Sequence, residues 1–237
     1  MLIGQMAAMR GIHGDMKKLF DKLTKTHLYW NVVVFAAVLA LLIIRWDSLE
    51  SYQHLAYALM LIMCLHQIEE YRLPGGFVYG FNQVFFRAKE PDHYPGNRLN
   101  ASTVDILYYI LTVPSLLFGS CSPRLSLFFA LFGLVECAVH LLLGILAYQR
   151  YYVKGKDTIY FPGSATAWLG FLPVSCATIY ALSQCGLLTG ELWGKTILFL
   201  VAYFLLGFML PTLTLMDKSS PYVYTITPHE GYFYKFQ

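Results

Sequence analysis

The segment Tyr52–Tyr71 reads YQHLAYALMLIMCLHQIEEY and is mostly apolar until it ends in a histidine and two glutamates. It is long enough to cross a membrane, because a span needs about 20 mostly apolar residues. On a helix, His66, Glu69 and Glu70 lie on one face, since they are three and four residues apart. We therefore expect a membrane helix bundle that buries a polar site.

A second apolar segment repeats this pattern. Glu136 and His140 are four residues apart and share a helix face. Ionisable side chains within a membrane span cost at least about 2.5–3.5 kcal/mol each, and they usually mark functional sites. Five such groups on two helices therefore indicate a function.

The composition agrees with a membrane protein. Of 237 residues, 57% are hydrophobic and 13% are charged, whereas a soluble domain carries about 25% charged residues. The expected spans are 28–44, 52–71, 101–119, 125–148, 164–183 and 192–213. We expect an all-α fold, a polytopic bundle of about six transmembrane helices that forms one domain over residues 28–213.

Lysine and arginine are unevenly distributed between the expected loops. One side has only Arg45, Arg124 and Lys195, and the other side, with both terminal segments, has all the rest. The positive-inside rule then predicts that both termini lie in the cytoplasm. We expect an integral membrane protein, with a bacterial inner membrane as its location. The basic residues form no dense patch, so no nucleic-acid partner is expected.

Three segments outside the spans carry further expectations. Segment 1–27 is expected to be a cytoplasmic amphipathic helix at the membrane interface, because its apolar residues recur at helical spacing. These residues are Ile12, Met16, Leu19, Phe20 and Leu23. The aromatic loop 72–100 is expected to be interfacial and to roof the polar site. The tail 214–237 is expected to pack on the cytoplasmic face.

Cys121 and Cys185 map to outer loops and are the only plausible disulfide partners.

The two polar faces can be compared by depth. At 1.5 Å per residue, His66 lies roughly 21 Å below the outer surface, and Glu136 and His140 lie roughly 17 and 22 Å below it. Asp105 on the neighbouring span falls at roughly 24 Å by the same rise. These groups can therefore form one layer.

Imidazole and carboxylate side chains together suit a bound transition metal. A zinc site would need His66, His140 and a glutamate, with Glu69 or Glu70 left as the catalytic base. A di-iron site takes two histidines and four carboxylates, a number that the chain can supply. The candidate metal ligands are His66, Glu69, Glu70, Glu136 and His140, with Asp105 as a possible addition.

The expected function is that of an integral membrane metalloenzyme that uses a divalent metal, with zinc favoured over iron. Metal-assisted hydrolysis of a lipidic or hydrophobic substrate is the first choice, because the site lies within the bilayer. The alternatives are a di-iron oxidase or hydroxylase, a metal-free acid–base isomerase, and an ion or proton carrier. A purely structural role, in which histidine and glutamate hold the helices together, is also open. No protein partner is indicated.

A third element stands at the start of the expected span 164–183. Pro162-Gly163 precedes a helix with Ser164 and Thr166 near its first turn, where free N–H groups can bind a carboxylate, phosphate or oxyanion. In order, the three elements resemble the HXXEE-motif family of membrane proteins, over about residues 57–181. The resemblance implies a shared membrane site around His66, Glu69, Glu70 and His140, and it implies little about the substrate.

Overall fold

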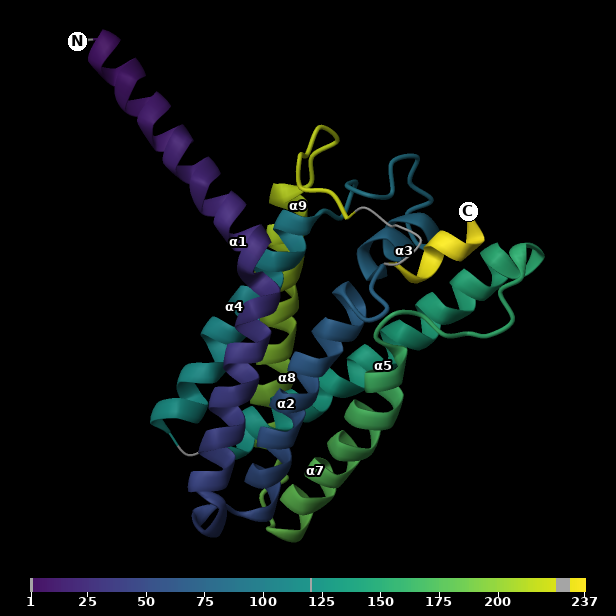
Figure 1. The fold of residues 1–237 in the computed structure, drawn as a ribbon. Helices are drawn as coiled ribbons and strands as arrows, with labels where there is room; N and C mark the ends of the chain where they lie inside the picture. The colour runs from purple at the N-terminus through teal and green to yellow at the C-terminus, as the bar shows by residue number, and fades with distance from the viewer. Residues whose placement is uncertain (1, 120, 225–230) are drawn as a thin grey trace.

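The computed structural model describes residues 2–119, 121–224 and 231–237, with side chains from Asp15 onward. Every regular element in these ranges is helical, which confirms the expected all-α fold (Figure 1). The long helices are α1 (Leu2–Ile44), α2 (Ser51–Tyr71), α4 (Arg98–Phe118), α5 (Pro123–Tyr151), α7 (Leu172–Gln184) and α8 (Gly190–Tyr203). The short ones are α3 (Phe77–Val84), α6 (Ser164–Thr166) and α9 (Leu210–Leu215).

Successive long helices run up and down, so both chain ends lie at the same end of the bundle (Figure 1). We call this the terminal end. The connections that follow α2 and α5 also lie there, and the connections that follow α1, α4 and α7 lie at the opposite end. The loops that carry most of the lysine and arginine therefore share one side of the bundle.

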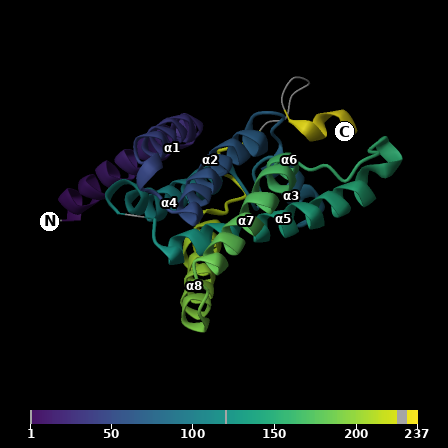
Figure 2. The same cartoon turned by 90° about the horizontal axis from the view of Figure 1, so that it is seen from below.

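Five segments of the described chain are long and apolar enough to cross a membrane. They are Asp15–Ile44, Arg98–Phe118, Pro123–Lys154, Ser164–Gln184 and Gly190–Leu215. Helix α2 has span length but is less apolar, because its last turns are polar. It lies between α1 on one side and α5 and α7 on the other (Figure 2), so its polar residues face protein rather than lipid. The expected span 52–71 is therefore a central, largely buried helix that is not among these five apolar segments.

Helix α1 is continuous from Leu2 to Ile44. The helical conformation of the N-terminal segment is confirmed, but the structure shows no break between an interfacial helix and the first span. Met16 and Leu19 are exposed, whereas the side chain of Ile12 lies outside the described side chains. The position of this segment on a membrane surface stays a prediction.

Two spans contain a widened, π-helical stretch, η3 (Ala167–Phe171) and η4 (Phe204–Met209). A proline, Pro173 or Pro211, follows each stretch within the next turn. Proline has no N–H to donate and its ring crowds the preceding turn, which favours such a local change in hydrogen bonding. The first stretch lies directly behind the polar site.

The segments at the terminal end pack against each other. Buried Asn82 of α3 organises the rest of the 72–100 loop, because its amide donates to the carbonyls of Pro91 and Gly96 and accepts from the Gly96 N–H. The C-terminal stretch η5 (Tyr232–Phe236) places Phe233 directly against Gly80 of α3. Residues 225–230 of the expected cytoplasmic tail lie outside the described residues.

The proposed pairing of Cys121 with Cys185 is not formed, because the structure has all five cysteines free. Cys121 is buried with its Sγ 3.3 Å from Ser126 Oγ, whereas Cys185 is exposed. The buried thiol is thus held by the start of α5 rather than by the opposite loop.

Candidate metal centre

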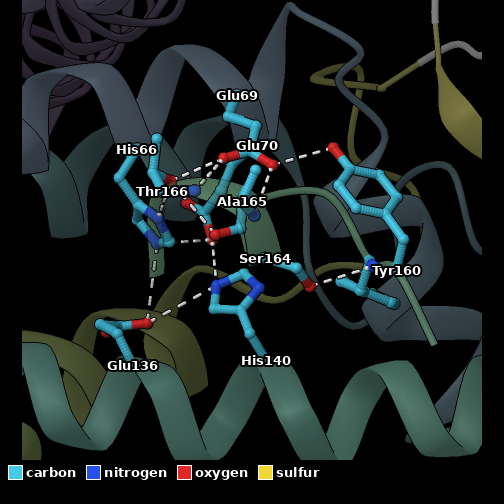
Figure 3. A network of polar contacts seen from close by, with 11 residues as sticks. His66, Glu69, Glu70, Glu136, His140, Tyr160, Ser164, Ala165 and Thr166 are labelled. Atoms are coloured by element: carbon cyan, nitrogen blue, oxygen red, sulfur yellow. Dashed lines mark hydrogen bonds and ion pairs between the residues drawn. The ribbon is translucent and has the colours of Figure 1, made fainter. Parts of the chain in front are cut away.

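Helices α2 and α5 bring four polar side chains to one point (Figure 3). His66 Nε2 lies 3.5 Å from Glu70 Oε1 and 3.8 Å from Glu136 Oε2. His140 Nε2 lies 3.2 Å from the same Glu70 oxygen and 3.8 Å from the same Glu136 oxygen. The helical spacings and the depth comparison thus placed these four residues in one layer, as the structure has them.

These separations suit a shared cation. Ligand atoms about 2.0–2.1 Å from a tetrahedral zinc ion are roughly 3.3 Å apart, close to the spacing seen here. The ligand atoms of His66, Glu136 and His140 all lie within 4.8 Å of one another. Glu70 contacts both histidines and lies beside these three ligand atoms.

Both histidines are almost completely buried. Each Nε2 atom lies within ion-pair distance of two carboxylates, but neither makes a hydrogen bond of good geometry among the described residues. Buried polar atoms without partners are uncommon, and each needs an explanation such as an unplaced ion or water. A cation bound by both nitrogens would satisfy them.

The orientation of the His66 ring is fixed by its contact with Thr166. Thr166 Oγ1 lies 2.6 Å from Glu69 Oε2, an acceptor, so the threonine hydroxyl donates its hydrogen there. Thr166 Oγ1 must then accept from His66 Nδ1, which lies 2.8 Å away. His66 therefore carries a proton on Nδ1, and its Nε2 atom faces the cluster. Metal-binding histidines are typically held by such an outer contact.

Glu69 lies one layer behind the cluster and its carboxylate is fully engaged. It accepts from the N–H groups of Ala165 and Thr166 at 3.0 and 2.8 Å, and from the Tyr160 hydroxyl at 2.9 Å. Burial, and then the negative charge of Glu69, raise the pKa of Tyr160, which therefore stays protonated and donates. The anion that the N–H groups after Pro162-Gly163 bind is thus the protein's own Glu69. Of the two adjacent glutamates, only Glu70 faces the four-residue cluster.

Gly163 packs against both imidazole rings. Its φ is +97°, and a Cβ at this position would lie 2.8 Å from His140 Nε2 and 2.9 Å from His66 Cε1. No other residue type fits here, because the backbone conformation disfavours a side chain and the rings leave no room for one. Ser164 is used in the same turn, where its Oγ accepts from the Phe161 N–H at 3.0 Å.

Asp105 does not join the four-residue cluster. Its Oδ2 lies 3.8 Å from Nε2 of buried His27, and the two atoms have no hydrogen-bond partner among the described residues. Of the six side chains counted for a di-iron site, four surround one point. Sequence reasoning missed His27, because that residue falls at the edge of the first expected span.

Three of the four cluster residues line a cavity of about 360 Å³, which we call the cluster cavity. His66, Glu70, Glu136 and Asp105 line one part of it, and the remaining lining is almost wholly apolar. Phe77, Phe81 and Phe85 of the 72–100 loop close one side, in stacked contact at centroid separations of 5.9 and 5.4 Å. The aromatic segment thus covers the site, as its position after Glu70 suggested.

The chain matches a known protein family. A family model described as "Protein of unknown function with HXXEE motif" matches residues 57–178, just over half of the chain. This range contains all four residues of the cluster, together with Glu69, Gly163 and Thr166. No curated protein and no solved structure matches the chain.

Proposed function

Because the chain belongs to the HXXEE-motif family, which is described as being of unknown function, we propose a function from the site itself. We propose that the protein is an integral membrane metalloenzyme, most simply a hydrolase, that binds one divalent cation and acts on a lipidic or hydrophobic substrate. His66, Glu136 and His140 would hold the cation. The observation that carries this proposal is the pair of buried Nε2 atoms that face two carboxylates and make no hydrogen bond of good geometry in the described structure.

The residues have distinct roles in such a centre. A divalent cation there would polarise a substrate oxygen and ease the deprotonation of a water molecule. Glu70 Oε1, 3.2 and 3.5 Å from the two Nε2 atoms, is placed to accept that proton and pass it to a leaving group. Thr166 and Glu69 hold the His66 ring in the tautomer that leaves Nε2 free. We favour zinc over iron, because three protein ligands with one position left for water suit a tetrahedral ion.

The proposed substrate class follows from the cluster cavity. Its aromatic and aliphatic lining would bind an apolar chain, and its single polar wall would position the reacting group. Phe85, Leu142 and Phe208 line the cavity and are themselves partly exposed on the outer surface of the bundle. A hydrophobic substrate would therefore enter from the bilayer.

We also propose that the protein lies in a bacterial inner membrane with both termini on the cytoplasmic side, because the basic loops share the terminal end. Cysteines introduced at Ser48 and Ser219, which lie at opposite ends and are exposed, provide the test in a background without native cysteines. Impermeant reagents should label Ser48→Cys and leave Ser219→Cys unlabelled in intact cells. The reverse pattern would disprove the orientation.

Metal analysis of protein purified without added metal tests the enzyme proposal. We expect one zinc per chain in the wild type and a loss of most of it in His66→Ala and His140→Ala. Gln67→Ala is the matched control, because Gln67 is equally buried on α2 but its amide oxygen accepts from Tyr109 on α4 at 2.8 Å. Full metal in both histidine variants, or no metal uptake by the wild type, would refute a metalloenzyme and leave an acid–base isomerase or proton carrier. Two irons per chain would support an oxidase instead.

A further inference from the structure

A second cavity, which we call the terminal-end cavity, lies between α1, the C-terminal end of α2 and the start of α4. Its volume is about 490 Å³. Among the described residues, it shares only Tyr71 with the lining of the cluster cavity. Lys25, Arg72 and Arg98 line it, and none of its lining residues in the described part of the chain is acidic. Lys25 and Arg98 thus give its wall two positive charges, and the cavity is separate from the metal centre.

Two hydrogen-bond donors at this cavity lack partners. The hydroxyl of Tyr224, a residue only 8% exposed, has no hydrogen-bond partner among the described residues, and neither has the buried Nε of Arg98. The Arg98 guanidinium lies over the Tyr224 ring, 5.0 Å from its centroid. Burial, and then the charge of Asp105, raise the pKa of Tyr224, so its hydroxyl keeps the proton and can donate. An oxyanion in the cavity would accept from both groups.

The outer edge of the cavity changes in character along α1. Lys25, Tyr29 and Val32 share one helix face at spacings of four and three residues, and all three line the cavity. The order along the helix is charged, aromatic and aliphatic, as at the boundary of a membrane. Tyr29 is 72% exposed and Val32 is 58% exposed, so this face is open to lipid. A ligand here would have an anionic group at the level of Lys25 and an apolar chain beside Val32.

We propose that the terminal-end cavity binds an anionic phospholipid, with the phosphate near Lys25, Arg98 and Tyr224 and an acyl chain along Tyr29 and Val32. Charge complementarity selects a negatively charged ligand, and the aromatic-to-aliphatic edge selects an amphiphile over a soluble anion. This lipid site does not depend on the metal centre, and it would be occupied whatever the reaction.

Native mass spectrometry of the full chain in detergent tests the lipid site. Phosphatidylglycerol and phosphatidylcholine with identical acyl chains are the probes, because both contain a phosphate and only the first has a net charge. We expect the wild type to retain phosphatidylglycerol at least about 10-fold better. Lys25→Gln alone, at an exposed position, should lower this retention by about 5-fold, and Lys25→Gln with Arg98→Gln by roughly 10- to 30-fold, since each basic residue contributes about 1 kcal/mol.

Arg87→Gln with Lys89→Gln is the matched control. Both residues are exposed at the same end of the bundle, and neither lines the cavity, so retention should not change. Equal retention of the two lipids, or equal losses in the test and control variants, would overturn the site. Displacement of the lipid by millimolar inorganic phosphate would overturn the choice of a lipid and favour a soluble anion. Metal content, measured on the same samples, should stay at the wild-type value and thus separates this proposal from that of the metal centre.

Discussion

Replacement of Gly163 by alanine tests whether close approach of the backbone to both histidine rings is needed for metal binding. Ordinary contact with a Cβ begins at about 3.4 Å, whereas a Cβ on Gly163 would lie 2.8 Å from His140 Nε2 and 2.9 Å from His66 Cε1. The His66 ring would have to retreat by about 0.5 Å, and the His140 ring by more than that, because its Cε1 atom is closer still. Metal–ligand distances tolerate only about ±0.2 Å, so both histidines would leave ligand positions together.

Backbone strain must be separated from this contact. Alanine at positive φ costs about 1–2 kcal/mol wherever it occurs. Gly155 is the matched control, because it has φ +87° in the same connection between α5 and α6, and a Cβ there would have no atom within 4 Å. Gly155→Ala therefore carries the strain without the collision.

The assay is zinc affinity, measured by competition with a chromophoric chelator, with the thermal midpoint recorded for each variant. Gly163→Ala should lose at least about 10–100-fold in affinity, the loss typical of a disturbed supporting shell. Gly155→Ala should bind zinc as the wild type does, with only a lowered midpoint. Wild-type affinity in Gly163→Ala, or an equal loss in both variants, would refute the reasoning.

Two further predictions follow from the contacts around the site. Thr166→Val removes the hydroxyl that orients His66 and should lower zinc affinity by about 10–100-fold. Thr178→Val loses only a hydroxyl that is bonded to its own helix, so it should not lower zinc affinity. Zinc titration of both variants tests this difference. Burial lowers the pKa of Lys156 to about 8, below its value of 10.5 in the unfolded chain. Between these values the unfolded chain binds a proton that the folded protein does not, so stability should rise with pH across that window. Lys156→Met should lack this rise in thermal midpoints, and an unchanged pH profile would contradict the assignment.

Much of the candidate site follows from local rules. Helical periodicity places His66 with Glu70 on one face and Glu136 with His140 on another, because i and i+4 side chains are neighbours in any α-helix. Alternating spans with a constant rise per residue then bring the two faces to one level. Both arguments use only the sequence near each residue, so they did not depend on how the bundle packs.

The choice between the two adjacent glutamates could not be made in this way. The sequence puts Glu69 and Glu70 on the same polar end of α2, and their spacings from His66 are equally compatible with binding a metal. Tertiary structure separates them, because the 160–166 connection, almost a hundred residues later in the chain, docks its N–H groups onto Glu69 and leaves Glu70 to the histidines. The approach of Gly163 to both rings and the pairing of His27 with Asp105 depend on similarly distant segments. By itself, the sequence determined which residues could meet, since helical spacing and apolarity are local properties; the packing of remote segments decided which of them do, since a hydrogen bond forms only where its partner is brought within reach.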